Sequence, residues 1–119
     1  EDEFKLEIDA TLELKDLNGE VVAGINQLKP FGRGNPEPVF QATGVKVVEG
    51  PTVLKDQHLV MTLNQEGHVF RAIAWQSAHR REFLLGLGGE IDVAYSIMEN
   101  HFRGESTVQL SVADVREAR

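Results

Sequence analysis

The 119-residue sequence contains no cysteine, which excludes disulfide bridges and thiolate metal ligands. It has no apolar run approaching the ~20 residues that a membrane-spanning helix needs. No basic-then-apolar leader opens the chain. We therefore expect a cytoplasmic protein without a membrane partner. The chain begins with Glu1 rather than Met, which indicates a fragment of a longer protein.

Positive charge is also scarce, with 12 Lys and Arg against 19 Asp and Glu and a net charge of −7. Eight acids and two lysines fall within residues 1–20, which leaves eleven acids and ten basic residues for the rest of the chain. The acidity is therefore mainly an N-terminal feature. Because phosphate contacts dominate affinity for nucleic acids, a nearly neutral main module should bind them weakly unless its cations share one face.

Proline is rare but concentrated, since three of the four prolines lie in residues 28–40 with Gly32 and Gly34 between them. Proline fixes φ and pushes the preceding residue into an extended conformation. The two glycines can adopt positive φ, which other residues reach only at a cost. This composition predicts a stiff, irregular loop from which Lys29 and Arg33 project.

The N-terminal part predicts a strand followed by a helix. Residues 4–14 alternate apolar and polar side chains, as a half-buried strand does. We expect its acidic residues to form the solvent face. Asp16 or Asn18 can cap the helix that follows, whose apolar residues recur every three or four positions. We therefore divide the chain into an N-terminal strand and helix extension, 1–30, and a main domain, 31–119.

The main domain reads as five strands with one short helix between the third and fourth. Gly44 marks a bulge in the first strand, and Ser77 caps the helix. This mainly β order is the layout of an oligonucleotide-binding (OB) barrel. The predicted strands are 40–48, 58–64, 69–76, 90–100 and 107–115, the helix is 77–87, and residues 51–55 are a turn or an irregular continuation of the first strand.

A resemblance to a known family lies in residues 28–40, which read Leu-Lys-Pro-Phe-Gly-Arg-Gly-Asn-Pro-Glu-Pro-Val-Phe. They resemble the segment leading into the C-terminal OB domain of RecJ-family single-strand-specific 5′→3′ DNA exonucleases. The resemblance extends from about residue 17 to residue 116. Later residues that agree with it are His58-Leu59, Ala72-Ile73-Ala74, Asn100, Gly104 and Gln109-Leu110.

The resemblance implies a single-stranded-DNA-binding domain of an exonuclease acting in DNA repair and recombination. Its implied partners are single-stranded DNA, the parent's own catalytic domains and a single-strand-binding protein. RecJ-type enzymes hydrolyse phosphodiesters with two cations held by Asp- and His-rich motifs, and none of those motifs occurs here. We expect no catalytic residue, metal site or cofactor in this chain, and Mg or Mn in catalytic domains preceding Glu1.

OB barrels commonly bind single strands on their second and third strands and the adjoining loops, using aromatic and basic side chains. Alternation turns Arg71 and Trp75 outward together, and a hairpin tip carries an aromatic residue beside a cation. The nucleic-acid-binding candidates are Lys29, Arg33, Asn35, Arg71, Trp75, His101, Phe102 and Arg103.

Each candidate group also has a purely structural interpretation. Trp75 could pack under the N-terminal helix with Arg71 merely solvated, Phe102 could fold back onto the barrel, and the Gly-Asn-Pro turn could be only a structural corner. The acidic balance supports another function, a protein-interaction module that docks the nuclease core or a single-strand-binding protein and has little DNA affinity. An OB domain from an RNA or translation factor is a third reading.

Overall fold

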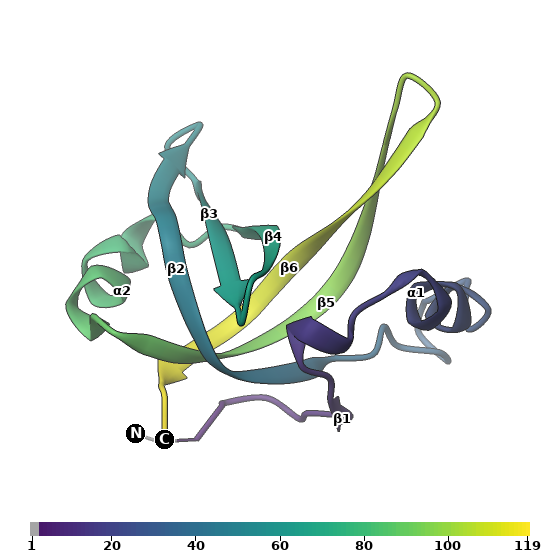
Figure 1. The fold of residues 1–119 in the computed structure, drawn as a ribbon, viewed down its shortest axis with the longest axis horizontal. Coiled ribbons are helices and arrows are strands. Elements are labelled where there is room, and N and C mark those ends of the chain that lie inside the picture. The colour runs from purple at the N-terminus through teal and green to yellow at the C-terminus, as the bar shows by residue number, and fades with distance from the viewer. Residues whose placement is uncertain (1–2) are drawn as a thin grey trace.

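The computed structural model describes residues 3–119, and its centre is a closed barrel of five strands (Figure 1). A short helix, α2 (Arg81–Leu87), preceded by the 3-10 turn η2 (Ala78–Arg80), lies between the third and fourth barrel strands. The predicted OB layout is therefore confirmed. The barrel strands are β2 (Phe40–Leu54), β3 (His58–Gln65), β4 (His68–Ala74), β5 (Glu90–Phe102) and β6 (Glu105–Glu117).

The barrel closes because β2 pairs with both β3 and β5. Around the sheet the order is β2, β3, β4, β6, β5, and only the β4–β6 contact within this ring is parallel. Alternate side chains fill the interior, as the period-two pattern predicts. Fully or almost fully buried barrel residues include Val45, Leu59, Met61, Leu63, Ala72, Ala74, Val93, Tyr95 and Leu110.

The predicted N-terminal strand is wrong in extent, because only β1 (Ala10–Thr11) pairs, in parallel, with Phe40–Gln41 of β2. Phe4, Leu6 and Ile8 are half-buried and alternate with exposed residues, so the side-chain pattern is present. A strand also requires a neighbouring strand to which it is hydrogen-bonded. The alternation of side chains in a sequence does not show whether such a neighbour exists. Glu1 and Asp2 lie outside the described residues.

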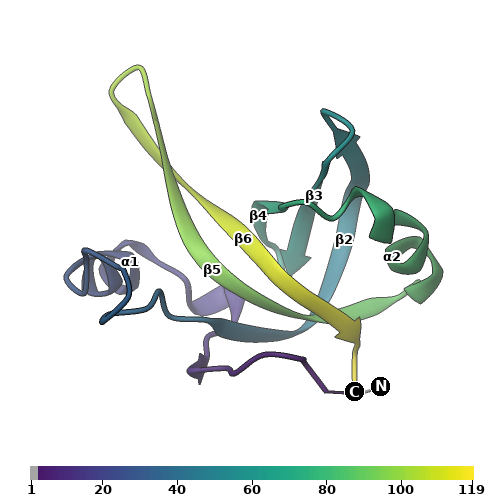
Figure 2. The same ribbon diagram turned by 180° about the vertical axis from the view of Figure 1, so that it is seen from behind.

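The N-terminal helix is confirmed as α1 (Gly19–Asn26), with the Asn18 side chain accepting a hydrogen bond from the Val21 N–H. A 3-10 turn, η1 (Leu14–Asp16), precedes it. Leu14 and Leu17 are buried in the same core cluster as the barrel residues, and α1 lies beside the β5–β6 hairpin (Figure 2). The division of the chain at residue 30 stays a prediction.

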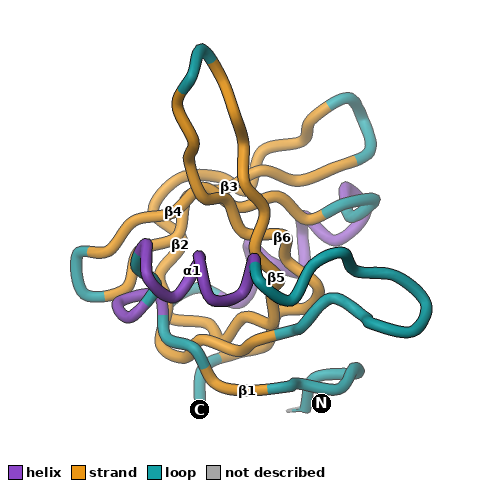
Figure 3. Tube along the Cα trace, turned by 90° about the vertical axis from the view of Figure 1, so that its right-hand side faces the viewer, coloured by secondary structure: helices purple, strands orange, loops and turns teal. Residues whose placement is uncertain are grey.

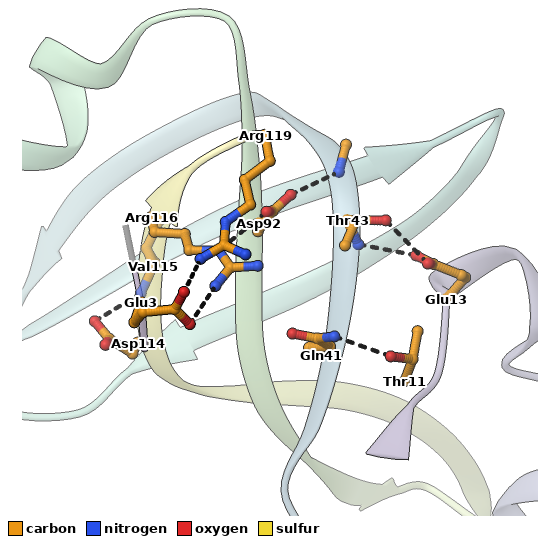
Figure 4. Close-up of polar contacts among 11 residues, drawn as sticks. Glu3, Thr11, Glu13, Gln41, Thr43, Asp92, Asp114, Val115, Arg116 and Arg119 are labelled. Carbon is orange, nitrogen blue, oxygen red and sulfur yellow. Dashed lines mark hydrogen bonds and ion pairs between the residues drawn. The ribbon is translucent and has the colours of Figure 1, made fainter. Parts of the chain in front are cut away.

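Glu13 corrects the expectation that the early acids form a solvent face. Its carboxylate accepts hydrogen bonds from the Thr43 N–H at 2.8 Å and the Thr43 hydroxyl at 2.9 Å (Figure 4). It also accepts one from the Gln65 amide at 2.8 Å. Partial burial acts to raise the pKa of Glu13, but these hydrogen bonds and nearby Lys15 outweigh it and hold the pKa below its usual value. Glu13 thus fastens the N-terminal segment to β2 and β3.

A second polar cluster fastens the other end of that segment. Arg116 pairs with the buried Asp92 at 3.0 Å, and Asp92 also accepts the Gly44 N–H at 3.1 Å. The Glu3 carboxylate pairs with the guanidinium groups of both Arg116 and Arg119 (Figure 4). Buried charges need such partners to offset desolvation, so the first described residues are held against β6.

Two further local predictions are confirmed and one is wrong. Of the two alternatives for residues 51–55, the irregular continuation is confirmed for residues 51–54, because β2 absorbs Gly50 and Pro51 as a register shift opposite β3. Ser77 does not cap η2; its hydroxyl instead donates to the Trp75 carbonyl. The bulge at Gly44 is confirmed by a register shift and a φ of +61°.

Candidate nucleic-acid interface

The outer face of β3 and β4 carries the first group of candidate residues. Strand pairing sets Thr62 opposite Arg71 and Val60 opposite Ile73, while their neighbours along each strand point into the barrel. Arg71 and Trp75 therefore share the outer face, as alternation predicts. Four residues of β-strand separate them by about 13 Å, so they can contact neighbouring nucleotides.

Trp75 is 48% exposed, so the interpretation that it packs beneath the N-terminal helix is wrong. Its indole lies edge-on to the His58 imidazole, with 5.0 Å between ring centroids. The His58 Nδ1 accepts the Gln76 N–H at 2.9 Å, which fixes the imidazole. Helix α1 instead lies beside the β5–β6 hairpin, near Glu99, Ser106 and Val108. A half-exposed indole supported on its edge is available for stacking.

The hairpin tip carries the second group, His101, Phe102 and Arg103, and all three are exposed. Figure 3 shows the β5–β6 hairpin extending beyond the ring of strands. Phe102 is 70% exposed, so the alternative that it folds back onto the barrel is wrong. The Arg103 guanidinium lies 5.1 Å from the Phe102 ring centroid, a cation–π distance.

The geometry of this tip follows from its two turn residues. Phe102 is paired with Glu105, so only Arg103 and Gly104 form the loop, with φ of 53° and 80°. Two positive φ values are typical of the two-residue turn that matches strand twist. The turn therefore places an aromatic ring and a cation together at the far end of the hairpin.

The proline-rich loop carries the third group, in which Lys29, Arg33 and Asn35 are all exposed. The Asn35 amide donates to the carbonyls of Leu28 at 2.6 Å and Pro30 at 2.9 Å, so it holds the loop in shape. A paired bridge between Gly32 and Asn35 closes the turn.

Gly32 and Gly34 can adopt positive φ, but neither does so in this loop. The Asn35 side chain and the Gly32 bridge, rather than unusual glycine dihedrals, give this loop its geometry.

Glu99 on β5 interacts electrostatically with one residue of the loop group, Lys29, and one of the hairpin group, His101. Hydrogen bonds from Asn26 and Ser106 lower the pKa of Glu99, burial opposes this slightly, and the charges of Lys29 and His101 lower the pKa further. Lys29 and His101 therefore act electrostatically on the same carboxylate from different segments. The structure places Arg71 on β4 and Trp75 just past its end, on a separate part of the surface.

Sequence reasoning missed His58, Glu49 and Thr62, which belong to the same outer face. The alternation of β3 could have identified His58 and Thr62, because it places them on the face of the strand away from the inward-pointing Leu59 and Leu63. Glu49 had no such signal, because its outward position depends on two register shifts in β2.

No metal site is present in the part of the chain that the structure describes. Within residues 3–119, no three His, Asp or Glu side chains come together in a way that could hold a metal ion. The same residues contain no helix that is long and apolar enough to cross a membrane.

Comparisons with known proteins agree with this geometry. The model of the RecJ OB domain family matches residues 8–114. A curated relative, the single-stranded-DNA-specific exonuclease RecJ of Thermus thermophilus, is 30% identical over 90 residues, covering 76% of this chain and 12% of that protein.

Solved structures of RecJ from the same organism, Thermus thermophilus, share the fold. The structure with Mn²⁺ matches 96% of this chain and 16% of its own, with a TM-score of 0.66 and 24% identity. The structure with Mg²⁺ matches 93% of this chain and 16% of its own, with a TM-score of 0.58 and 25% identity. This chain thus spans less than a fifth of these relatives, and it belongs to the RecJ OB domain family.

Proposed function

We propose that this chain is the single-stranded-DNA-binding domain of a RecJ-like 5′→3′ single-strand-specific exonuclease acting in DNA repair and recombination. The observation that carries the proposal is the half-exposed Trp75 on the same outer face as Arg71. OB barrels use this face to stack bases on aromatic rings and to meet phosphates with cations.

The exposed groups suggest how a strand would be held. A base stacks on the indole of Trp75 while Arg71 contacts a phosphate, and Phe102 with Arg103 provides a second contact of the same kind at the hairpin tip. Lys29 and Arg33 on the proline-rich loop extend the basic surface. Because few cations are involved in a chain of net charge −7, the affinity is modest and depends strongly on salt.

The proposal places the chemistry in other parts of a longer protein. The curated relative is described as a single-stranded-DNA-specific exonuclease, and this chain covers 12% of it. The domain would hold the strand and guide its 5′ end toward catalytic domains that use Mg or Mn. We propose a cytoplasmic location for the parent protein.

A salt titration tests the proposal. Anisotropy of a labelled single-stranded oligonucleotide should rise with added protein at low salt, and the binding should weaken as salt increases. Removing one phosphate contact by Arg71→Ala or Arg103→Ala should lower the slope of log K against log salt by about 0.7. Lys5→Ala is the matched control, because Lys5 is an exposed cation on the N-terminal segment.

The acidic balance favours a second function, a module that docks the nuclease core or a single-strand-binding protein. A folded protein that binds no single strand even at low salt would overturn the first proposal and favour the second. Equal salt slopes for wild type and for both arginine variants would show that these side chains do not contact phosphate.

A further inference from the structure

A hollow of about 310 Å³ lies on the outer face of the barrel where β2 departs from regular pairing with β3. Its lining includes Glu49 and Gly50 from β2, Val60 and Thr62 from β3, and Arg71 from β4. The hollow adjoins the register shift at Gly50, which has a φ of +83° and where a side chain would lie 2.6 Å from the Val60 carbonyl oxygen. The absence of a side chain lets the two backbones approach closely.

Three polar residues form a row along one side of this hollow. Glu49 is paired with Thr62, and Thr62 is paired with Arg71, so the row crosses β2, β3 and β4. Directly paired side chains have Cβ atoms about 5 Å apart. The row therefore sets a carboxylate and a guanidinium at opposite ends, with a hydroxyl between them.

The next row is more apolar. Thr52 is paired with Val60, and Val60 is paired with Ile73. These residues form a floor beside the polar row, and Trp75 lies two residues beyond Ile73, just past the end of β4. A flat ring lying on this floor would turn one edge toward Glu49 and Arg71.

The two charged groups retain most of their hydrogen-bonding capacity. The Thr62 hydroxyl donates to Glu49 Oε1 at 2.9 Å, and residues 3–119 offer that carboxylate no other hydrogen bond. Within the same residues, the Arg71 guanidinium has no hydrogen bond or ion pair. An ionised carboxylate only accepts hydrogen bonds and a guanidinium only donates them, so the row has an accepting end and a donating end.

We propose that the row Glu49–Thr62–Arg71 reads the edge of one base of the bound strand and prefers cytosine to thymine. This inference rests on the proposed single-strand binding and adds base preference to it. Cytosine presents an amino group, N4, at one end of its pairing edge and a carbonyl oxygen, O2, at the other. Glu49 accepts from N4 while one N–H of Arg71 donates to O2, and the other guanidinium N–H groups remain for the phosphate contact.

Thymine fits the same row badly because it has a carbonyl oxygen at both ends of the edge. Arg71 can donate to one of them, but the other, O4, then faces the Glu49 carboxylate with two acceptors opposed. The two pyrimidines have similar ring size and stacking faces, so the discrimination depends on the hydrogen-bonding edge. Stacking on Trp75 is tolerant of sequence and does not compete with this preference.

The test compares labelled dC and dT homo-oligonucleotides of equal length, titrated with the 119-residue protein at low salt and slightly alkaline pH, where cytosine is unprotonated. One net hydrogen bond predicts roughly two- to tenfold tighter binding of the dC strand. Glu49→Gln should bring this ratio close to one, because the amide can donate to thymine O4 as well as accept from cytosine N4.

The control is Glu20→Gln, which removes the same charge from an exposed position on α1. It should strengthen binding of both strands alike and leave their ratio unchanged. Equal affinities of wild type for dC and dT would overturn the inference while leaving single-strand binding intact. A preference that survives Glu49→Gln would also overturn it, since another part of the face would then be responsible. Binding of neither strand would refute the proposed function and this inference together.

Discussion

Gly50 is the backbone position where the structure predicts the largest effect of a single methyl group. Its φ of +83° lies in the region that other residues rarely adopt, and an added Cβ would lie 2.6 Å from the Val60 carbonyl oxygen and 3.1 Å from the Thr52 nitrogen. Both neighbours are backbone atoms, so they cannot move aside as a flexible side chain would. Gly50→Ala should therefore shift β2 away from β3 or be severely strained.

The loss of stability in Gly50→Ala can be estimated from the backbone strain and from the close backbone contact. A residue forced into an unfavourable backbone region costs about 1–3 kcal/mol, and the backbone contact adds to that cost. We expect a loss of at least about 2 kcal/mol in the free energy of unfolding. For a domain near 100 residues, this corresponds to a fall in Tm of roughly 8 °C or more.

Gly34→Ala is the matched control, because Gly34 does not have positive φ and nothing lies within 4 Å of its Cβ position. It should leave stability unchanged or raise it by about 0.4–1 kcal/mol through the unfolded state. Thermal unfolding followed by circular dichroism measures both variants. A Tm for Gly50→Ala within about 2 °C of wild type, equivalent to roughly 0.5 kcal/mol, would refute the close approach of β2 and β3.

Three further predictions concern the loop, the N-terminal segment and catalysis. Asn35→Ala should lower stability by about 1 kcal/mol, because the carbonyls of Leu28 and Pro30 lose their donor; an unchanged denaturant midpoint would contradict a structural role. The pKa of Glu13 is lowered in the folded protein from an ordinary value of 4.5, so its contribution to stability is present above that value and is lost as pH falls through the lower folded-state pKa. Acid unfolding curves should therefore be flatter for Glu13→Gln than for wild type, and parallel curves would count against the hydrogen-bond network. Incubation with Mg²⁺ or Mn²⁺ should leave a 5′-labelled single strand intact, because residues 3–119 bring no metal-ligand cluster together; metal-dependent shortening that co-purifies with the protein would contradict this.

The barrel could be predicted from sequence because each strand satisfies the same local rule. Leu59, Met61 and Leu63 alternate with outward residues, and the glycines at 88 and 89 end the helix with positive φ. The alternation rule fails where the structure of a segment depends on the strand it pairs with. Phe4 to Ile8 alternates in burial without hydrogen-bonded strand pairing, and the β2 strand continues through Pro51 because β3 follows its register shift.

The interface was only partly predictable for the same reason. Arg71 and Trp75 share a face by alternation alone, so their placement needed only the strand. The exposure of Trp75 and Phe102 could not be derived, because it depends on where α1 and the hairpin lie. Glu13 looked like one acid among eight, and its role comes from Thr43 and Gln65, which are 30 and 52 residues away.

Trp75 allows the most direct test of single-strand binding on the outer face, because it is the only tryptophan in the chain. Its half-exposed indole should be quenched when a base stacks on it. Titration with a single-stranded oligonucleotide at low salt should give saturable quenching that has the same midpoint as anisotropy and is reversed by added salt. Phe83→Ala, which removes an aromatic ring of equal exposure on α2, should leave the quenching unchanged. Binding detected by anisotropy without any change in tryptophan emission would contradict the assignment of this face.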